Sequence, residues 1–193
     1  MFAPFADPQP KDIEALVAAY PLAWVVTRQF NASPLPLIAE HDEAGEIVSL
    51  IGHCGKRNLI VEDLRADPAA LILFNGPSGY ISNRMVSEPN WGPTWNYAAV
   101  RFHCDVEFVE NETETALDRL LDHVERDYDD RWHVDQLGDR YAAMLAQIIA
   151  FRAHVVSVHP TFKLGQDERP EIFREIVDRI EDDALAAAMQ ASR

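Results

Sequence analysis

Short runs of hydrophobic residues, separated by polar turns, occupy most of the chain up to residue 109. The run Leu22–Thr27 is apolar and ends in Val-Val-Thr, which predicts a buried strand. Two further runs flank the polar turn His41–Gly45, so we expect them to pair as a hairpin. The run Ala69–Phe74 is expected to end at the turn residues Asn75-Gly76-Pro77. The strands predicted here cover residues 22–27, 35–39, 47–51, 69–74, 79–82 and 94–109, the last as one bent strand or two.

The hydrophobic period changes to that of a helix after residue 110. A stripe from Leu117 to Tyr128 has the spacing of an amphipathic helix, with Asn111 as its expected cap. A second stripe runs from Tyr141 to Ile149, and a strand follows over 151–158. The other predicted helices cover 11–20, 58–65 and 172–180. Most strands follow one another without helices between them, which predicts an α+β fold: an antiparallel barrel or sheet with added helices. We expect one domain over residues 1–193, with helical additions around 111–149 and 170–190.

An aromatic segment follows the turn Gly92-Pro93 and is expected to form a strand. Successive side chains of a strand face opposite sides, so Trp95 and Tyr97 share one face while Thr94 and Asn96 share the other. One face offers rings for packing, and the other offers a hydroxyl and an amide. This arrangement suits a flat polar ligand such as a flavin, and it equally suits an ordinary sheet.

Four motifs in order resemble the FMN-binding negative transcriptional regulators of the PaiB type. They are Gly52-His53 followed by Lys56, Arg57 and Asn58; Phe74–Pro77 with Tyr80-Ile81-Ser82; Pro93–Tyr97; and Lys163-Leu164-Gly165-Gln166. The resemblance covers roughly residues 1 to 180. It implies a split β-barrel of the pyridoxamine-phosphate-oxidase-like class, FMN as the cofactor, and a homodimer with the ligand site at its interface.

The segment His53–Asn58 is the candidate phosphate site. It leaves a predicted strand and enters a predicted helix, with Asn58 as the expected cap. Lys56 and Arg57 would lie near the helix N-terminus, where the helix dipole already favours an anion. The structural alternative is that both are solvated surface charges.

The rest of the flavin would be lined by Thr94, Trp95, Asn96, Lys163 and Gln166, a role that the resemblance implies. Each residue also has a purely structural alternative. Trp95 would lie in the core, and Asn96 would hydrogen-bond within a turn or bulge. Lys163 would be a surface residue, with Gln166 leading into a helix. Because Trp95 and Asn96 face opposite ways, at most one of them is expected to touch a given ligand directly.

Three segments depart from the pattern of the family. Asn83-Arg84-Met85-Val86 stands where relatives carry Pro, a variable residue and Trp-Tyr, and Ser33-Pro34-Leu35 replaces an expected histidine. Gly165-Gln166-Asp167-Glu168 ends in acids where relatives end in a basic residue, and acids near a phosphate would repel it. These changes point to a weaker flavin site, a different ligand, or none.

Composition narrows the function classes. The chain has 193 residues, with 48% hydrophobic and 25% charged, as in a globular protein with a substantial core. It has 17 Lys and Arg against 32 Asp and Glu in total, and the resulting net charge of -15 disfavours direct DNA binding. No apolar run is long enough for a membrane helix, and residues 1–10 lack the pattern of a signal peptide, so we expect a cytoplasmic protein.

The cysteines and histidines give no clear metal pattern. Cys54 and Cys104 do not form a disulfide framework, although a single bridge between them is open from the sequence. His53-Cys54 and His103-Cys104 are adjacent pairs, whereas zinc ligands usually stand two to four residues apart, so no metal site is expected. A haem-binding barrel, with a ligand among the four histidines 53, 103, 154 and 159, is a third alternative.

No nucleophile in a recognisable catalytic setting and no phosphate-cradling glycine loop is present in the sequence. Any chemistry would therefore be carried by the cofactor. The first hypothesis is an FMN-binding split-barrel protein, of uncertain enzymatic status, that acts by redox chemistry on an unknown small molecule. The alternative is a non-catalytic transcriptional regulator or sensor of the PaiB type.

Overall fold

A computed structural model describes residues 8–193 of the chain. The chain divides into two compact units, which we call the barrel unit (residues 17–74 and 101–158) and the C-terminal unit (residues 8–16, 75–100 and 159–193). The prediction of a single domain over 1–193 remains a prediction. The first seven residues, part of the segment expected to lack a signal peptide, lie outside the described residues.

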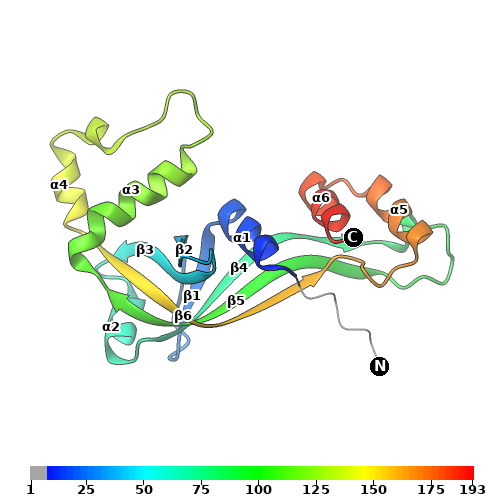
Figure 1. Ribbon diagram of the computed structural model, residues 1–193, viewed down its shortest axis with the longest axis horizontal. Coiled ribbons are helices and arrows are strands. Elements are labelled where there is room, and N and C mark those ends of the chain that lie inside the picture. Colours follow the sequence, from blue (N-terminus) through cyan, green and yellow to red (C-terminus); the bar gives the residue numbers. More distant parts are fainter. Residues whose placement is uncertain (1–7) are drawn as a thin grey trace. The chain divides into compact units, whose positions relative to one another are not determined.

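Six strands form a closed barrel in the order β1-β2-β3-β6-β5-β4 (Figure 1). This confirms the predicted α+β antiparallel barrel. β2 and β3 form the predicted hairpin, with Leu37 opposite Gly52. The strands are β1 (Leu22–Thr27), β2 (Ala32–His41), β3 (Ile47–Gly55), β4 (Ala69–Ile81), β5 (Thr94–Phe108) and β6 (Ile148–Lys163).

The core of the barrel unit follows from the alternation of side chains along the strands. In β1, Ala23 and Val25 are fully buried while their neighbours Leu22 and Trp24 are exposed. Phe74 and Phe102 meet inside the barrel unit edge to face, with ring centroids 5.6 Å apart. On the outside of the barrel, α3 packs on β2 and β3 around Ile51.

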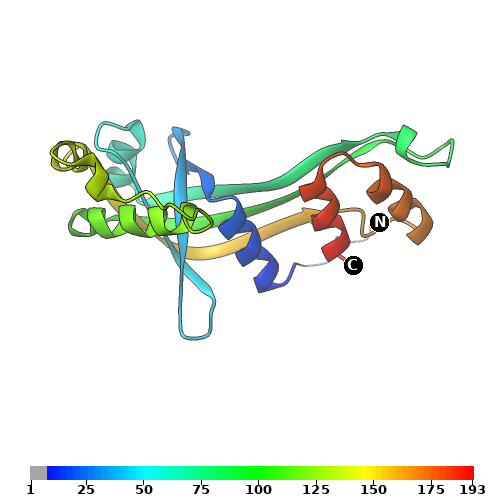
Figure 2. The same cartoon turned by 90° about the horizontal axis from the view of Figure 1, so that it is seen from above.

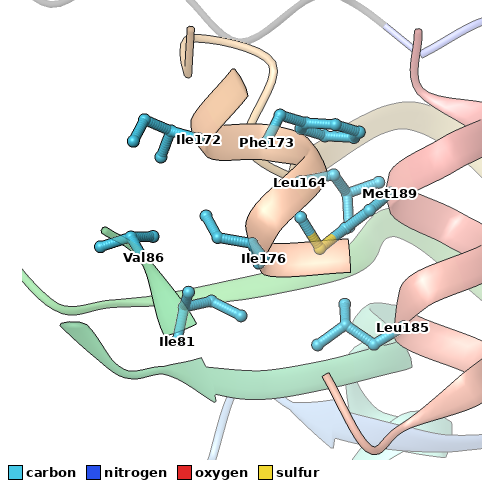
Figure 3. Packing of buried hydrophobic residues seen from close by; sticks show 8 residues of the cluster. All are labelled: Ile81, Val86, Leu164, Ile172, Phe173, Ile176, Leu185 and Met189. Atoms are coloured by element: carbon cyan, nitrogen blue, oxygen red, sulfur yellow. The ribbon is translucent and has the colours of Figure 1, made fainter. Parts of the chain in front are cut away.

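The helices are α1 (Pro10–Ala19), α2 (Leu59–Ala66), α3 (Thr113–Val124), α4 (Arg140–Leu145), α5 (Pro170–Arg179) and α6 (Asp183–Ala191), with short 3₁₀ turns η1 (Asn83–Met85), η2 (Glu110–Glu112) and η3 (Val134–Leu137). In the C-terminal unit, α5 and α6 lie side by side (Figure 2). They enclose a small core with the end of β4, drawn in Figure 3. Its buried members are Ile81, Val86, Leu164, Ile172, Phe173, Ile176, Leu185 and Met189.

The prediction that a strand ends at Asn75-Gly76-Pro77 is wrong, because β4 runs on to Ile81 as one strand. Gly76 explains the continuity. A Cβ atom at this position would lie 2.9 Å from Leu16 Cδ1 and 3.3 Å from the backbone oxygen of Ala98. Glycine therefore serves close packing inside a strand here, not a turn.

Two helix boundaries also differ from the prediction. Ile148 and Ile149 belong to β6, where they pair with Gly55 and Cys54, because strand pairing in the barrel outweighs their helical spacing. Asn111 does not cap α3, since it lies within η2 and the helix begins at Thr113. Over residues 8–193, no helix combines the length and apolar character needed to cross a membrane.

Candidate functional site

The end of β3 leads into α2 through the tight turn formed by residues 55–58. The Asn58 N–H donates to the Gly55 oxygen at 2.9 Å. The side-chain oxygen of Asn58 accepts from the Ile60 N–H at 3.2 Å and from the Ser33 hydroxyl at 2.9 Å. Asn58 is therefore the N-cap of α2, as the sequence predicted.

Lys56 and Arg57 carry unneutralised charges beside this capped helix. Both side chains are exposed, and neither makes a hydrogen bond or ion pair with any described residue. The Lys56 backbone N–H donates to Gln147 at 2.9 Å, which holds the turn in place. Two free cations at the N-terminus of an eight-residue helix suit a phosphate group.

His53 contributes a buried polar atom to the same segment. Within residues 8–193 its Nδ1 is buried without a hydrogen-bond partner. Burial lowers the pKa of His53, so the imidazole is neutral at neutral pH. Neutral imidazole offers one donor and one acceptor, and an unsatisfied ring nitrogen favours a ligand that supplies the missing partner.

A hollow of about 680 Å³ opens in the C-terminal unit. Thr94, Asn96 and Lys163 line it, together with Trp91, Asp167 and Glu168. The Lys163 ammonium donates to the Thr94 hydroxyl. Its volume lies within the usual range for small-molecule sites.

The predicted alternation along β5 is confirmed at Trp95 and Asn96. Asn96 is 2% exposed and points inward, whereas Trp95 is 57% exposed, so the alternative of a core Trp95 is wrong. Trp95 instead lies beside Tyr80, with ring centroids 6.0 Å apart.

Gln166 uses both ends of its amide inside its own loop. Its oxygen accepts from the Leu164 N–H at 2.7 Å, and its nitrogen donates to the Phe162 oxygen at 2.8 Å. The amide thus holds the turn that follows Lys163.

The loop that follows the departing segment 83–86 contacts the chain at and after the departing segment 165–168, in the C-terminal unit. The Trp91 indole N–H lies 3.1 Å from both carboxylate oxygens of Glu168. Ser87 is bound by Glu175, with its hydroxyl 2.7 Å from Oε1, and Glu88 pairs with Arg169. Charged side chains of α5 and of the residues just before it therefore bind the loop after η1.

Of the predicted site residues, the structure brings Thr94, Trp95, Asn96 and Lys163 together along one hollow. His53, Lys56, Arg57 and Asn58 belong to the barrel unit. Sequence reasoning missed Trp91 and Glu168. The only signal in the sequence was the acid at residue 168 where relatives carry a basic residue. This signal showed that the chain differs from its family there, but not that Glu168 contacts Trp91.

The cysteines are buried and free of disulfides. Burial raises the pKa of Cys54 to about 11, and burial together with Asp105 raises the pKa of Cys104 to about 12. Across residues 8–193, no group of three or more His, Cys, Asp and Glu is placed to hold a metal ion.

Comparison with known families and structures decides the class of the chain. The family model described as "Putative FMN-binding domain" matches residues 1–157. The chain belongs to this family. The resemblance to the PaiB type is confirmed, because the chain is 26% identical over 143 residues to the protease synthase and sporulation protein PAI 2 of Bacillus subtilis, across 73% of this chain and 69% of that protein.

Solved structures share the fold at low sequence identity. The flavocytochrome Anf3 from Azotobacter vinelandii matches with a TM-score of 0.63 at 13% identity, over 95% of this chain and 75% of that one. The FAD and heme binding protein from Mycobacterium smegmatis matches with a TM-score of 0.59 at 14% identity, over 81% and 72% of the two chains. The fold is thus a split barrel, and the family to which the chain belongs is described as an FMN-binding domain.

Proposed function

We propose that this FMN-binding protein holds the cofactor phosphate at Lys56, Arg57 and Asn58 and uses the flavin in a redox step on a small molecule. The observation that carries the phosphate site is the pair of exposed, unpartnered cations beside a capped helix N-terminus. Such groups bind a phosphate without first breaking an ion pair within the protein. His53, with its unsatisfied Nδ1, belongs to the same proposed site.

Thr94, Asn96 and Lys163 are proposed to serve the polar edge of the isoalloxazine ring. This edge carries carbonyl oxygens and ring nitrogens, which bind hydroxyl, ammonium and amide groups. Gln166 would act by holding the loop that positions Lys163, because its amide is engaged with the backbone. Trp95, on the other face of β5, would offer an aromatic surface to the ligand.

A homodimer with the flavin site at the subunit interface is part of the proposal. An apolar strip on the outside of the barrel unit supports it: Trp24 lies opposite Leu73 on one side and Pro34 on the other. Cross-strand partners share a face, so Leu22, Val26, Pro36 and Leu71 extend the strip. Exposed apolar patches of this kind mark protein interfaces.

Trp24→Glu tests the dimer. The substitution places a charge in the strip, whereas Val48→Glu places one on β3 at an exposed valine outside it. We expect the mass from light scattering to fall to that of the 21.8 kDa monomer for Trp24→Glu alone. A wild-type protein that is already monomeric refutes the dimer.

A non-catalytic regulator or sensor is the second candidate, and the sporulation protein among the relatives supports it. The net charge of -15 disfavours direct contact with DNA, so regulation would act through a partner or through the flavin. We also propose a cytoplasmic location, since two free cysteines suit a reducing compartment.

The decisive experiment is a titration of FMN into cofactor-stripped protein, followed by quenching of flavin fluorescence. Lys56→Ala and Arg57→Ala are each expected to weaken binding about tenfold or more, because each removes a charge-assisted contact. Lys11→Ala removes an exposed lysine of α1 and serves as the control. Tight binding that is equal in all variants refutes the phosphate site, and absence of binding refutes the function.

A further inference from the structure

Asn96 presents an unused hydrogen-bond acceptor in the hollow of the C-terminal unit. Asn96 is almost completely buried, with 2% of the residue exposed. Its nitrogen lies 3.5 Å from the Met189 sulfur, and its oxygen accepts no hydrogen bond from any described residue. This oxygen is therefore free to accept an N–H or O–H group from a ligand in the hollow.

Two carboxylates lie in the same hollow without a cationic partner. Glu168 accepts from the neutral indole of Trp91, and Asp167 is exposed and unpaired within residues 8–193. Arg193 donates to the backbone oxygen of Glu168 and not to its carboxylate. Neither carboxylate is therefore neutralised by an ion pair with a described residue.

Aromatic rings complete the lining. Trp91, Trp95 and Tyr97 all border the hollow. Aromatic faces attract organic cations through the ring quadrupole, and carboxylates attract them by charge. Rings combined with carboxylates and an amide oxygen form a set that recognises ammonium groups.

We propose that this hollow binds an organic cation, a ligand with an ammonium group attached to an apolar or aromatic body. The inference goes beyond the proposed flavin function because it concerns the carboxylates of Asp167 and Glu168, while Trp95 and Asn96 belong to both proposed sites. Glu168 would be the main specificity-determining residue, with Trp91 holding its carboxylate in place.

Lys163 supplies a distinctive control because it carries the opposite charge in the same hollow. Among the described residues, its ammonium hydrogen-bonds with Thr94 alone. A bound cation would be repelled by Lys163 and attracted by Glu168. Removal of the Glu168 charge should therefore lower the affinity for the cation, whereas removal of the Lys163 charge should raise it.

The test uses benzylammonium as the probe, with benzyl alcohol as its neutral counterpart and benzoate as its anionic one. Binding is measured by calorimetry on the full-length protein. Glu168→Gln keeps the size of the side chain, and Glu181→Gln is the matched control, since Glu181 is an exposed acid of the same unit outside the hollow. Lys163→Met removes the opposing charge.

We expect benzylammonium to bind about tenfold more tightly than either counterpart. Glu168→Gln should lower its affinity about fivefold, Glu181→Gln less than twofold, and Lys163→Met should raise it. Equal binding of benzylammonium and benzyl alcohol, or equal losses in the two glutamate variants, would overturn the inference. A parallel FMN titration separates the two proposals: FMN binding without ammonium selectivity refutes only this inference, and selectivity without FMN binding refutes only the flavin function.

Discussion

Trp91 donates its indole N–H to both carboxylate oxygens of Glu168, at 3.1 Å each, across 77 residues of sequence. Glu168 lies in a segment where the chain departs from the pattern of its family, and Trp91 lies in the loop that follows another such segment. The acid at 168 therefore has a structural partner inside the protein. A base at this position would leave the indole N–H without its acceptor.

Glu168→Ala removes this acceptor. We expect the free energy of unfolding to fall by about 1 kcal/mol, the usual net contribution of a hydrogen bond, and the emission of Trp91 to shift to the red as the ring gains access to water. Urea denaturation and fluorescence measure the two effects, with Trp91→Phe to assign the emission. An effect no larger than that of Glu181→Ala would mean that the Trp91 contact contributes nothing.

The sequence predicted what depends on local pattern. The β2–β3 hairpin, the Asn58 cap and the opposite facing of Trp95 and Asn96 follow from turn residues, capping preference and strand alternation. The continuity of β4 through Gly76 could not be predicted, because the close contact that requires glycine comes from residues distant in sequence.

The candidate site shows the same division. The sequence predicted the Asn58 cap and the placing of Lys56 and Arg57 beside it, since both depend on neighbours in sequence. That the two cations have no partner among the described residues came only from the structure. The role of Gln166 could not be predicted, because nothing in the sequence indicates that its amide bonds to the backbone of Leu164 and Phe162. The Trp91–Glu168 contact depends on the folding of α5 against the loop and has no local signal.

Glu40 ties β2 to β6 and α3 in the barrel unit. Its carboxylate accepts from Arg152 Nε and Ser49 Oγ, both at 2.6 Å, and also from Arg119. Burial opposes its ionisation, but the hydrogen bonds from Arg152, Ser49 and Arg119 outweigh burial and lower the pKa of Glu40 to about 2. The unfolded chain keeps the ordinary value of 4.5.

This shift predicts a pH dependence of stability. A pKa that is lower in the folded state stabilises the fold fully above the unfolded value, and that stabilisation is lost as the pH falls through the folded value. Glu40→Gln should therefore destabilise the protein more at pH 7 than at pH 3, as measured by urea denaturation at both values. Glu43→Gln, an exposed acid in the turn after β2, is the control. A difference that does not change with pH would contradict the proposed cause.

Asn58 allows the structural and binding roles of its segment to be separated. Asn58→Ala loses the cap of α2 and the bond to Ser33, so we expect a loss of about 1 kcal/mol in stability. Asn58→Asp keeps a capping acceptor but adds a negative charge beside Lys56 and Arg57. Its stability should stay close to that of the wild type, while its affinity for FMN falls about tenfold. Wild-type affinity in Asn58→Asp would place the phosphate elsewhere.

Gly52 gives the sharpest test of the barrel itself. A Cβ atom there would lie 2.8 Å from the Pro36 backbone oxygen, with Leu37 Cδ2 closer still, whereas a Cβ at Gly55 in the same strand meets nothing within 4 Å. Gly52→Ala should therefore lower the free energy of unfolding by about 1–3 kcal/mol, because the backbone of β2 must move away. Gly55→Ala should change it by less than about 0.5 kcal/mol. Urea denaturation of the pair decides the matter: equal stabilities would mean that β2 and β3 do not approach as closely at Pro36 as the barrel requires.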